Sequence, residues 1–283
     1  MKKKTLMITG ASGFIGSNFI ERYKDKYNII PMDLLKVKPE EIDFNGVDTV
    51  LHLAALVHQM QGAPREKYFE VNTELTKKVA EEAKKQGVKH FVFYSTVAVY
   101  GTHGEIYKKL VLDKNSKVNP KTPYAESKWQ AEEILRELED NNFKLAILRP
   151  PMVYGKNCPG NMRRLEKLVD ILPILPFNYD ENKRTLVEIN KLLEITDEVV
   201  EKEILGIIIP KDDKDISIKE IVEKIMKEKN KKKILIKFPN FIFKLLVKMK
   251  PQIMESLYGD LRFEERRFFN NVRTISKYSN ASI

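Results

Sequence analysis

A tyrosine and a lysine stand four residues apart at the start of a helical pattern, in residues 123–135, "PYAESKWQAEEIL". On a helix, Tyr124 and Lys128 share one face. A free tyrosine has a pKa of about 10, and a nearby ammonium group lowers it by favouring the phenolate. The pair could therefore move a proton to or from a substrate oxygen. The short pattern also fits two unrelated side chains on a helix surface, so its meaning depends on the rest of the chain.

Three glycines follow the first apolar run, in "TGASGFIG" at residues 9–16. In a strand-to-helix turn, Gly10 would permit the sharp bend, Gly13 would let the backbone approach a pyrophosphate, and Gly16 would allow close helix packing. The N-terminus of the following helix would offer free N–H groups to the phosphates. A simple turn is the alternative, and the position directly after a strand favours a dinucleotide site.

An acidic residue follows the second apolar run, where a dinucleotide-binding domain needs one. Asp33 lies 17 residues after Gly16 and could accept hydrogen bonds from the adenosine ribose. Its charge would repel a 2′-phosphate, which favours NAD over NADP. A turn aspartate at the end of a strand is the alternative, and Lys36 could soften the preference.

The elements that would hold these residues alternate between short apolar runs and helical patterns. Such alternation predicts βαβ units and a parallel sheet that is covered by helices on both faces. The segment 34–46 is too short for a full helix, and "ILGIII" at 204–209 predicts one further buried strand. The expected strands are 5–9, 28–32, 49–53, 90–94 and 144–148, and the expected helices are 14–24, 66–86 and 124–139.

Charge and cysteine content limit the class of protein. The 283 residues carry a net charge of +10, which could indicate a nucleic-acid or anionic-membrane partner, but most lysines alternate with glutamates on helical patterns. The run 227–233, "KEKNKKK", is expected to be a solvated helix end and loop. The single cysteine, Cys158, excludes an intramolecular disulfide and fits a reducing cytoplasmic location. No cluster has the spacing of a metal site.

The C-terminal part differs in composition. The run 238–249, "FPNFIFKLLVKM", is apolar with a few lysines, and it is too short to span a membrane. It could lie on a membrane surface, although a helix packed on its own domain is the favoured interpretation. Residues 266–283 show little pattern and are expected to be mobile. The first residues lack the features of a secretory signal.

Five motifs follow one another along about the first 155 residues. They are "TGASGFIG" at 9–16, "DTVLHLAA" at 48–55, "YSTVAVYG" at 94–101, "PYAESK" at 123–128 and "LRPPMVYG" at 148–155. In this order they make the chain resemble the extended short-chain dehydrogenase/reductase superfamily, specifically the NAD-dependent epimerase/dehydratase family that acts on nucleotide sugars. The resemblance implies a Rossmann-like doubly wound parallel sheet in residues 1–155, completed by a strand near 204–209, and a smaller C-terminal substrate-binding lobe in residues 156–283.

The resemblance also implies roles for matching positions. Thr96, Tyr124 and Lys128 correspond to the family's catalytic triad, and Lys128 would also bind the nicotinamide ribose. Substrate contacts are implied for Asn72, and for Asn161 and Arg184 beside the sugar diphosphate. The implied cofactor-binding residues are Gly10, Gly13, Phe14, Ile15, Gly16, Asp33, Leu53, Ala54, Ala55, Tyr124 and Lys128.

Enzymes of this family catalyse several different reactions with the same triad and cofactor site. Its dehydratases carry an Asp-Glu pair directly after the triad threonine, whereas Val97 and Ala98 follow Thr96 here, which argues against dehydration. Many of its epimerases carry an asparagine where this chain has Met152. The motif "LRPPMVYG" also resembles a subgroup that reduces or epimerises C4 of UDP-linked N-acetyl, 6-deoxy sugars for surface polysaccharides. Epimerisation and 4-keto reduction both stay open, and Asp33 favours an epimerase that retains NAD.

Two other classes were weighed. A non-catalytic dinucleotide-binding sensor or scaffold would explain the short C-terminal part, but it would not need a complete triad. A nucleic-acid binder rests on net charge alone, so we expect a UDP-sugar substrate and no nucleic-acid partner. Relatives in the family commonly dimerise through the helices that correspond to 66–86 and 124–139, so the resemblance implies a homodimer.

Several polar residues are expected to be structural. His52 would be a packed strand histidine, and His58 a loop histidine. Nothing near Cys158 predicts an activated thiol. Tyr100 and Tyr154, each before a glycine, are expected to be packing aromatics.

Overall fold

The computed structural model describes residues 3–57 and 63–264. His58 and the C-terminal residues 266–283, which were expected to be mobile, lie outside the described residues. None of the helices in the described part is both long enough and apolar enough to cross a bilayer.

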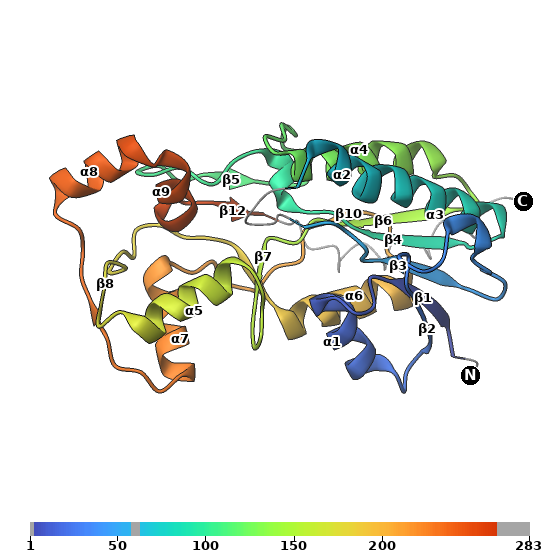
Figure 1. Cartoon of the computed structure of the whole chain (residues 1–283), viewed down its shortest axis with the longest axis horizontal. Coiled ribbons are helices and arrows are strands. Elements are labelled where there is room, and N and C mark those ends of the chain that lie inside the picture. Colours follow the sequence, from blue (N-terminus) through green and yellow to red (C-terminus); the bar gives the residue numbers. More distant parts are fainter. Residues whose placement is uncertain (1–2, 58–62, 265–283) are drawn as a thin grey trace, which may run out of the picture.

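A six-stranded parallel sheet forms the centre of the molecule (Figure 1). Its order is β10-β6-β4-β3-β1-β2, and the register pairs Leu6 with Ile29 on one side and with Thr49 on the other. Its three inner strands β1, β3 and β4 are buried along their whole length, because helices cover both faces. The strands are β1 (Thr5–Thr9), β2 (Asn28–Met32), β3 (Thr49–His52), β4 (His90–Tyr94), β6 (Lys144–Leu148) and β10 (Gly206–Ile208).

The five strands predicted from the first half of the sequence are confirmed, four with identical bounds and β3 one residue shorter. The segment 34–46 contains only a 3-10 turn, η1 (Pro39–Glu41), as its composition indicated. The chain runs outward from β1 to β2 and then crosses to β3 on the other side of β1. Ligands of open α/β sheets bind at such a reversal, at the carboxyl ends of the strands.

Helices cover the sheet in two layers (Figure 1). On one face α1 (Phe14–Tyr23) and α6 (Ile189–Lys202) pack around Leu6, Ile8 and Leu51. On the other face lie α2 (Arg65–Phe69), α3 (Leu75–Lys85) and α4 (Pro123–Leu138), which pack around Val50 and Phe91. The residues that could do chemistry lie where these two layers meet the carboxyl ends of the strands.

The helix predicted over 66–86 is not one regular α-helix. A wider π turn, η2 (Glu70–Glu74), separates α2 from α3. Asn72 lies in this turn, fully buried. Its side chain accepts a hydrogen bond from Leu56 N at 2.8 Å and donates to Leu56 O and to Ser127 Oγ, both at 3.0 Å. These contacts join the segment after β3 to α4, and the helical periodicity of the sequence gives no sign of them.

The second part of the chain builds a lobe at the carboxyl end of the sheet (Figure 1). The segment 189–208 returns to the sheet as α6 and β10, so the expected division at residue 155 is not a single spatial boundary. The lobe has three two-stranded parallel pairs: β7 (Met152–Tyr154) with β9 (Leu186–Glu188), β5 (Val111–Leu112) with β12 (Arg262–Phe263), and β8 (Ile174–Leu175) with β11 (Ile234–Leu235). Its helices are α5 (Asn161–Ile171), α7 (Ile218–Glu228), α8 (Asn240–Met249) and α9 (Pro251–Tyr258).

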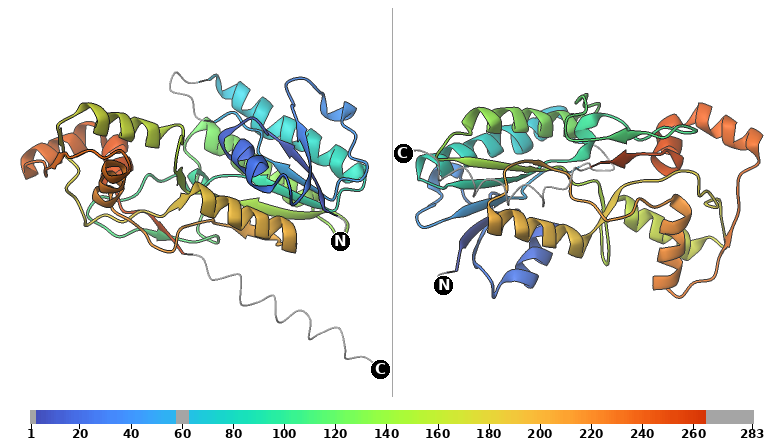
Figure 2. Two further views of the ribbon diagram at one scale, coloured as in Figure 1. Left: turned by 90° about the horizontal axis from the view of Figure 1, so that it is seen from below. Right: turned by 180° about the vertical axis from the view of Figure 1, so that it is seen from behind.

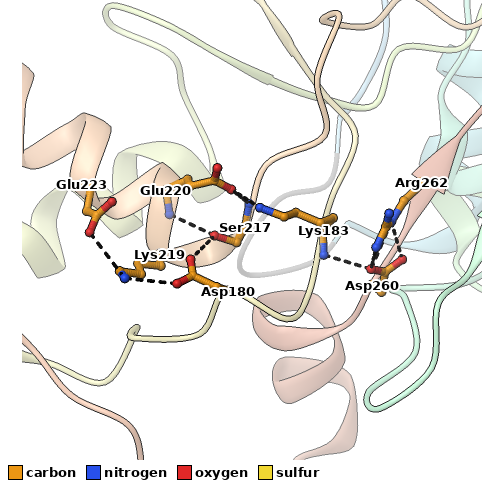
Figure 3. A network of polar contacts seen from close by, with 8 residues as sticks. All are labelled: Asp180, Lys183, Ser217, Lys219, Glu220, Glu223, Asp260 and Arg262. Atoms are coloured by element: carbon orange, nitrogen blue, oxygen red, sulfur yellow. Dashed lines mark hydrogen bonds and ion pairs between the residues drawn. The ribbon is translucent and has the colours of Figure 1, made fainter.

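A network of polar side chains fixes the connections within this lobe (Figure 3). Lys183 Nζ donates to Glu220 Oε2 at 2.5 Å, and its backbone N–H donates to Asp260 Oδ2 at 2.9 Å. Ser217 caps α7 and also contacts Asp180. The loop before β9 is thereby tied both to α7 and to the strand that follows α9.

The helix α8 fits its predicted packing only on one side. Phe243 is buried in the lobe, and Leu246 and Val247 pack beside it. Phe241, Leu245 and Met249 are exposed. The predicted packing of this run on its own domain is therefore confirmed for one side of the helix, and the other side is exposed.

Candidate active site

Two helix starts place the predicted triad. Thr96 lies two residues after the end of β4 and caps the 3-10 turn η3 (Val97–Tyr100), with its Oγ1 accepting a hydrogen bond from Ala98 N at 3.1 Å. Thr122 caps α4 in the same way, through Ala125 N at 3.2 Å. Tyr124 therefore lies in the first turn of α4 and Lys128 in the second.

The triad and the glycine turn line the same cleft, which has a volume of about 460 Å³. Thr96, Tyr124 and Lys128 all contribute to its lining. The turn after β1 and the segment after β3 contribute Gly10, Gly13, Phe14, Ile15, Gly16, Leu53 and Ala55, and the segment 150–162 contributes Pro150, Pro151, Met152, Val153, Cys158, Pro159, Asn161 and Met162. Tyr94, Ser95 and Val57 also line the cleft. The quoted sequence motifs contain most of the lining positions, whereas Val57, Cys158, Pro159 and Met162 lie outside them and were not predicted as site residues.

The glycine turn has no room for side chains at two of its positions. A Cβ on Gly16 would lie 2.5 Å from the carbonyl oxygen of Gly10, and one on Gly10 would lie 2.7 Å from Ala54 N. Gly10 also has a φ of +68°, which side chains disfavour. The backbone of this turn therefore forms an open cradle at the start of α1, the form that receives a pyrophosphate.

Lys128 is buried, and its ammonium group lacks a hydrogen-bond acceptor among the described residues. The residue is 1% exposed, and within the described part of the chain its Nζ has no hydrogen-bond acceptor. It lies 4.3 Å from the centre of the Phe93 ring. Burial lowers the pKa of Lys128 to about 7, although the nearby Glu132 carboxylate acts in the opposite direction. Ribose hydroxyl groups of a bound dinucleotide would supply the missing acceptors, so the residues present fit NAD.

Tyr124 behaves differently from the expectation. Burial raises the pKa of its phenol to about 12, and hydrogen bonding with Thr96 opposes this rise. The expected lowering of the Tyr124 pKa by Lys128 is therefore wrong for the protein without its cofactor, because desolvation of the phenol outweighs the other effects. Thr96, rather than Lys128, is the triad member that stabilises the phenolate here.

A buried carboxylate behind the triad was not found from the sequence. Glu132 lies one turn after Lys128 on α4 and is fully buried. Its Oε1 accepts hydrogen bonds from Ser95 Oγ at 2.5 Å and from Arg149 Nε at 2.9 Å, and its Oε2 accepts from Arg149 Nη2 and Arg136 Nη2, each at 2.6 Å. The spacing of Tyr124, Lys128, Glu132 and Arg136, every four residues, was the available signal.

Among the cofactor and substrate residues predicted outside the triad, Asn161 and Asp33 differ in whether they line the cleft. Asn161 lines the cleft at the start of α5. Asp33 follows β2, where its Oδ1 accepts a hydrogen bond from Leu35 N at 3.0 Å and its Oδ2 lies 3.6 Å from Lys36 Nζ. The turn role and the Lys36 contact are thus both present, and one carboxylate oxygen is free of backbone bonds.

Two predicted substrate residues are engaged elsewhere. The Asn72 amide is bonded to Leu56 and Ser127, as described above. Arg184 Nη1 donates to three backbone carbonyls, those of His103, Glu255 and Gly259, at 2.9–3.1 Å. Neither residue lines the cleft. Their geometry is that of structural residues, and it does not support the substrate contacts that the resemblance implied.

The residues expected to be structural are packed. His52 is fully buried between Thr9 and Thr76, and burial lowers its pKa to about 3. Burial raises the pKa of the Cys158 thiol to about 11, so the thiol is protonated and unreactive. Tyr100 and Tyr154 are buried and also form hydrogen bonds, to Arg149 at 2.8 Å and to Asp212 at 2.6 Å.

The parallel sheet reverses its strand order at the glycine cradle, and a Thr/Tyr/Lys set lines the same cleft. These features define a dinucleotide-dependent enzyme of the short-chain dehydrogenase/reductase type. Comparison with known families agrees. Residues 6–202 match the model of the "NAD dependent epimerase/dehydratase family", and the chain belongs to this family. It is accordingly an NAD-dependent enzyme with a Rossmann-like fold.

Individual relatives carry related names. The chain is 28% identical to a UDP-glucose 4-epimerase of Vibrio cholerae, over 92% of this chain and 87% of the relative. It is also 28% identical to the N-acetyl-alpha-D-glucosaminyl-diphospho-ditrans,octacis-undecaprenol 4-epimerase of Escherichia coli O157:H7, over 80% and 73%. A solved UDP-N-acetylglucosamine 4-epimerase of Methanobrevibacter ruminantium M1 has the same fold, with a TM-score of 0.70, 22% identity, and coverage of 98% and 93%.

Proposed function

We propose that this chain epimerises C4 of a UDP-linked sugar, using NAD that stays bound during the reaction. The observation that carries the proposal is that Thr96, Tyr124 and Lys128 line the same cleft as the glycine cradle. The buried Lys128 Nζ, which lacks an acceptor, supports a cofactor ribose beside it. The names of the relatives support C4 of a sugar as the reacting position.

The side chains divide the work as follows. The glycine cradle and Lys128 would hold NAD, which would supply reversible hydride transfer at C4 of the sugar. Tyr124 Oη removes the proton from the C4 hydroxyl group and then gives a proton back to the same oxygen. Thr96 Oγ1 positions that oxygen and shares a hydrogen bond with the phenol. Lys128 holds the cofactor ribose and places positive charge on the same helical face as Tyr124.

Protonation of the free enzyme has a consequence for this mechanism. With a pKa of about 12, the buried phenol is protonated at neutral pH until further positive charge enters the cleft. The free enzyme is therefore prepared to donate a proton, and it becomes a proton acceptor only in the loaded complex. Because the phenol accepts a proton only after cofactor and substrate are bound, Tyr124 would not transfer protons before both are in place.

The 4-keto reduction that shares this apparatus is the alternative, and retention of cofactor distinguishes the two. An epimerase regenerates its NAD in each cycle, whereas a reductase must exchange it. We expect mass spectrometry of the denatured, purified protein to release NAD. An empty cleft, together with consumption of reduced cofactor by a 4-keto sugar nucleotide, would instead establish the reductase.

The catalytic test uses one conservative change and a matched control. Tyr124→Phe removes only the phenol oxygen, and we expect it to slow interconversion of C4 epimers by about 10²- to 10⁴-fold. Tyr107→Phe makes the same change at an exposed tyrosine outside the cleft and should leave the rate unaltered. The substrates are a panel of UDP-sugars, with an undecaprenyl-diphosphate sugar included because of one relative's name. Equal rates for the two variants would refute the mechanism.

The remaining proposals concern domains and assembly. We infer that residues 1–155 with the strand at 206–208 bind NAD, and that the lobe within 156–283 binds the sugar nucleotide beside Asn161. A homodimer through α3 and α4 stays a prediction. None of the large exposed apolar side chains of the described residues lies on these two helices, so a dimer there would be held by polar contacts. Sedimentation at rising salt concentration would test it.

A further inference from the structure

The segment 229–254 has an unusual charge pattern. It contains eight lysines and neither aspartate nor glutamate. It spans the end of the loop after α7, β11, the whole of α8 and the first turn of α9. Figures 1 and 2 show α8 at the end of the molecule that lies farthest from the edge strand β2. This end of the lobe is therefore strongly basic and points away from the sheet.

The same segment exposes large apolar side chains. Phe241, Leu245 and Met249 are 74%, 54% and 62% exposed and recur every four residues, so they follow one face of α8. Ile253, in the first turn of α9, is 56% exposed. Only Phe243 of α8 is buried. A row of large apolar side chains exposed to water lowers the solubility of a protein, so we expect a binding partner to cover it.

The lysines lie beside this row. Lys244 and Lys248 immediately precede Leu245 and Met249, so they form a second row about 100° around the helix. Both are exposed, as is Lys250. Among the described residues, these three lysines have no ion pair, whereas Lys237 pairs with Glu181. An apolar row bordered by unpaired lysines complements an apolar layer that has anionic groups at its surface.

A second copy of the chain fits this face poorly. A symmetric contact would place each lysine row against its own copy, and like charges at an interface are unfavourable. A membrane surface fits it well. The ten residues of α8 span about 15 Å, too short to cross a bilayer but suited to lie in the interface with apolar side chains among the acyl chains.

We propose that the exposed face of α8 and the first turn of α9 docks on the surface of a membrane that contains anionic lipids. Phe241, Leu245, Met249 and Ile253 enter the interface, and Lys244, Lys248 and Lys250 contact lipid phosphates. The contact is reversible and salt-dependent, because it combines a small apolar area with charge attraction. It holds the cleft near the membrane without closing it, since none of these residues lines the cleft.

Vesicle flotation of the full chain tests the proposal. We expect binding to phosphatidylcholine vesicles that contain phosphatidylglycerol and little binding to phosphatidylcholine alone. Lys244→Gln with Lys248→Gln should weaken binding about thirtyfold, from the loss of two charges near the surface. Phe241→Glu with Met249→Glu should weaken it at least as much. Leu35→Glu changes a 96% exposed leucine on the other part of the molecule and serves as the control.

Each outcome decides the proposal. Circular dichroism and C4 epimerase activity on a soluble UDP-sugar establish that the variants are folded, since the changed side chains are exposed and lie outside the cleft. No binding to either vesicle, equal binding to both, or equal loss in Leu35→Glu would overturn it. Concentration-dependent self-association that the Phe241→Glu with Met249→Glu variant abolishes, in the absence of vesicle binding, would assign the face to a second copy instead.

Discussion

The buried carboxylate of Glu132 allows a quantitative test of how the triad is supported. Glu132→Ala removes the acceptor for Ser95, Arg136 and Arg149 in one step. Within the described part of the chain, the fully buried Arg149 then keeps a side-chain hydrogen bond only to Tyr100. Breaking a buried ion pair from one side costs about 3–5 kcal/mol, because the remaining charge is left without compensation. We expect a loss of that size in the free energy of unfolding.

The measurement is urea denaturation of cofactor-free protein, followed by circular dichroism. Small domains unfold with a total free energy of about 5–15 kcal/mol, so the variant should remain folded in water but with a much lower midpoint. Glu137→Gln changes an exposed carboxylate on the same helix and should alter stability by less than about 0.5 kcal/mol. A loss below about 1 kcal/mol for Glu132→Ala would refute the assignment of a buried ion pair.

The same variant makes a second, separate prediction at Lys128. The Glu132 charge raises the pKa of Lys128 against the effect of burial, so its removal should lower that pKa further below about 7. Titration of isotopically labelled lysine side chains by NMR would show the shift. An unchanged Lys128 pKa in the folded Glu132→Ala protein would mean that Glu132 supports the fold alone and does not influence the triad.

Three further predictions follow from packing and burial. His52 and His90 have pKa values of about 3 and about 4 in the folded chain, against about 6.5 when unfolded, so the unfolded chain binds more protons below pH 6.5. The free energy of unfolding should therefore fall with acidification, by up to about 1.4 kcal/mol per pH unit for each histidine. Urea midpoints at pH 7 and pH 5 measure this fall, and His90→Gln should make the free energy of unfolding less dependent on pH. Gly16→Ala should abolish NAD binding by calorimetry, since its Cβ would lie 2.5 Å from a carbonyl oxygen, whereas Gly46→Ala, with open space around it, should cost only about 1 kcal/mol of backbone strain. Asn72→Ala should lower the free energy of unfolding by about 2–3 kcal/mol, because partners on two elements lose hydrogen bonds in a buried position, and an effect below 0.5 kcal/mol by urea denaturation would contradict that role.

Local patterns predicted the sheet well because its strands are buried runs with short connections. The run "TLMIT" needs only its own apolar residues and the following glycines to be recognised as a strand that leads into a turn. The triad was predictable for a similar reason, since Tyr124 and Lys128 lie on one helix and their spacing alone places them together. These features depend on neighbours in sequence.

Features that depend on distant residues were not predictable. Glu132 is recognisable as an ion-pair partner only when β6 delivers Arg149 beneath α4, which a linear pattern does not indicate. Arg184 was expected at a diphosphate, but the carbonyls of residues 103, 255 and 259 converge on it from two separate segments, the loop at 103 and the end of α9. The Tyr124 pKa was misjudged because a sequence gives the charges near a phenol but not its desolvation.

The π turn at Glu70–Glu74 has a consequence for how this chain tolerates change in length. A π turn accommodates one residue more than the α-helix around it, so the chain carries an inserted residue whose displacement is absorbed within a single turn. Deleting Thr73 would restore an α-helical path through the turn and leave the helices on either side of it in their present register. Val79, Ala80 and Ala83 would therefore stay in the core. The same deletion inside α3 has no wider turn to absorb it and would rotate the residues that follow by about 100°. A change of one residue in length is therefore far less damaging at this turn than within the helix that follows it.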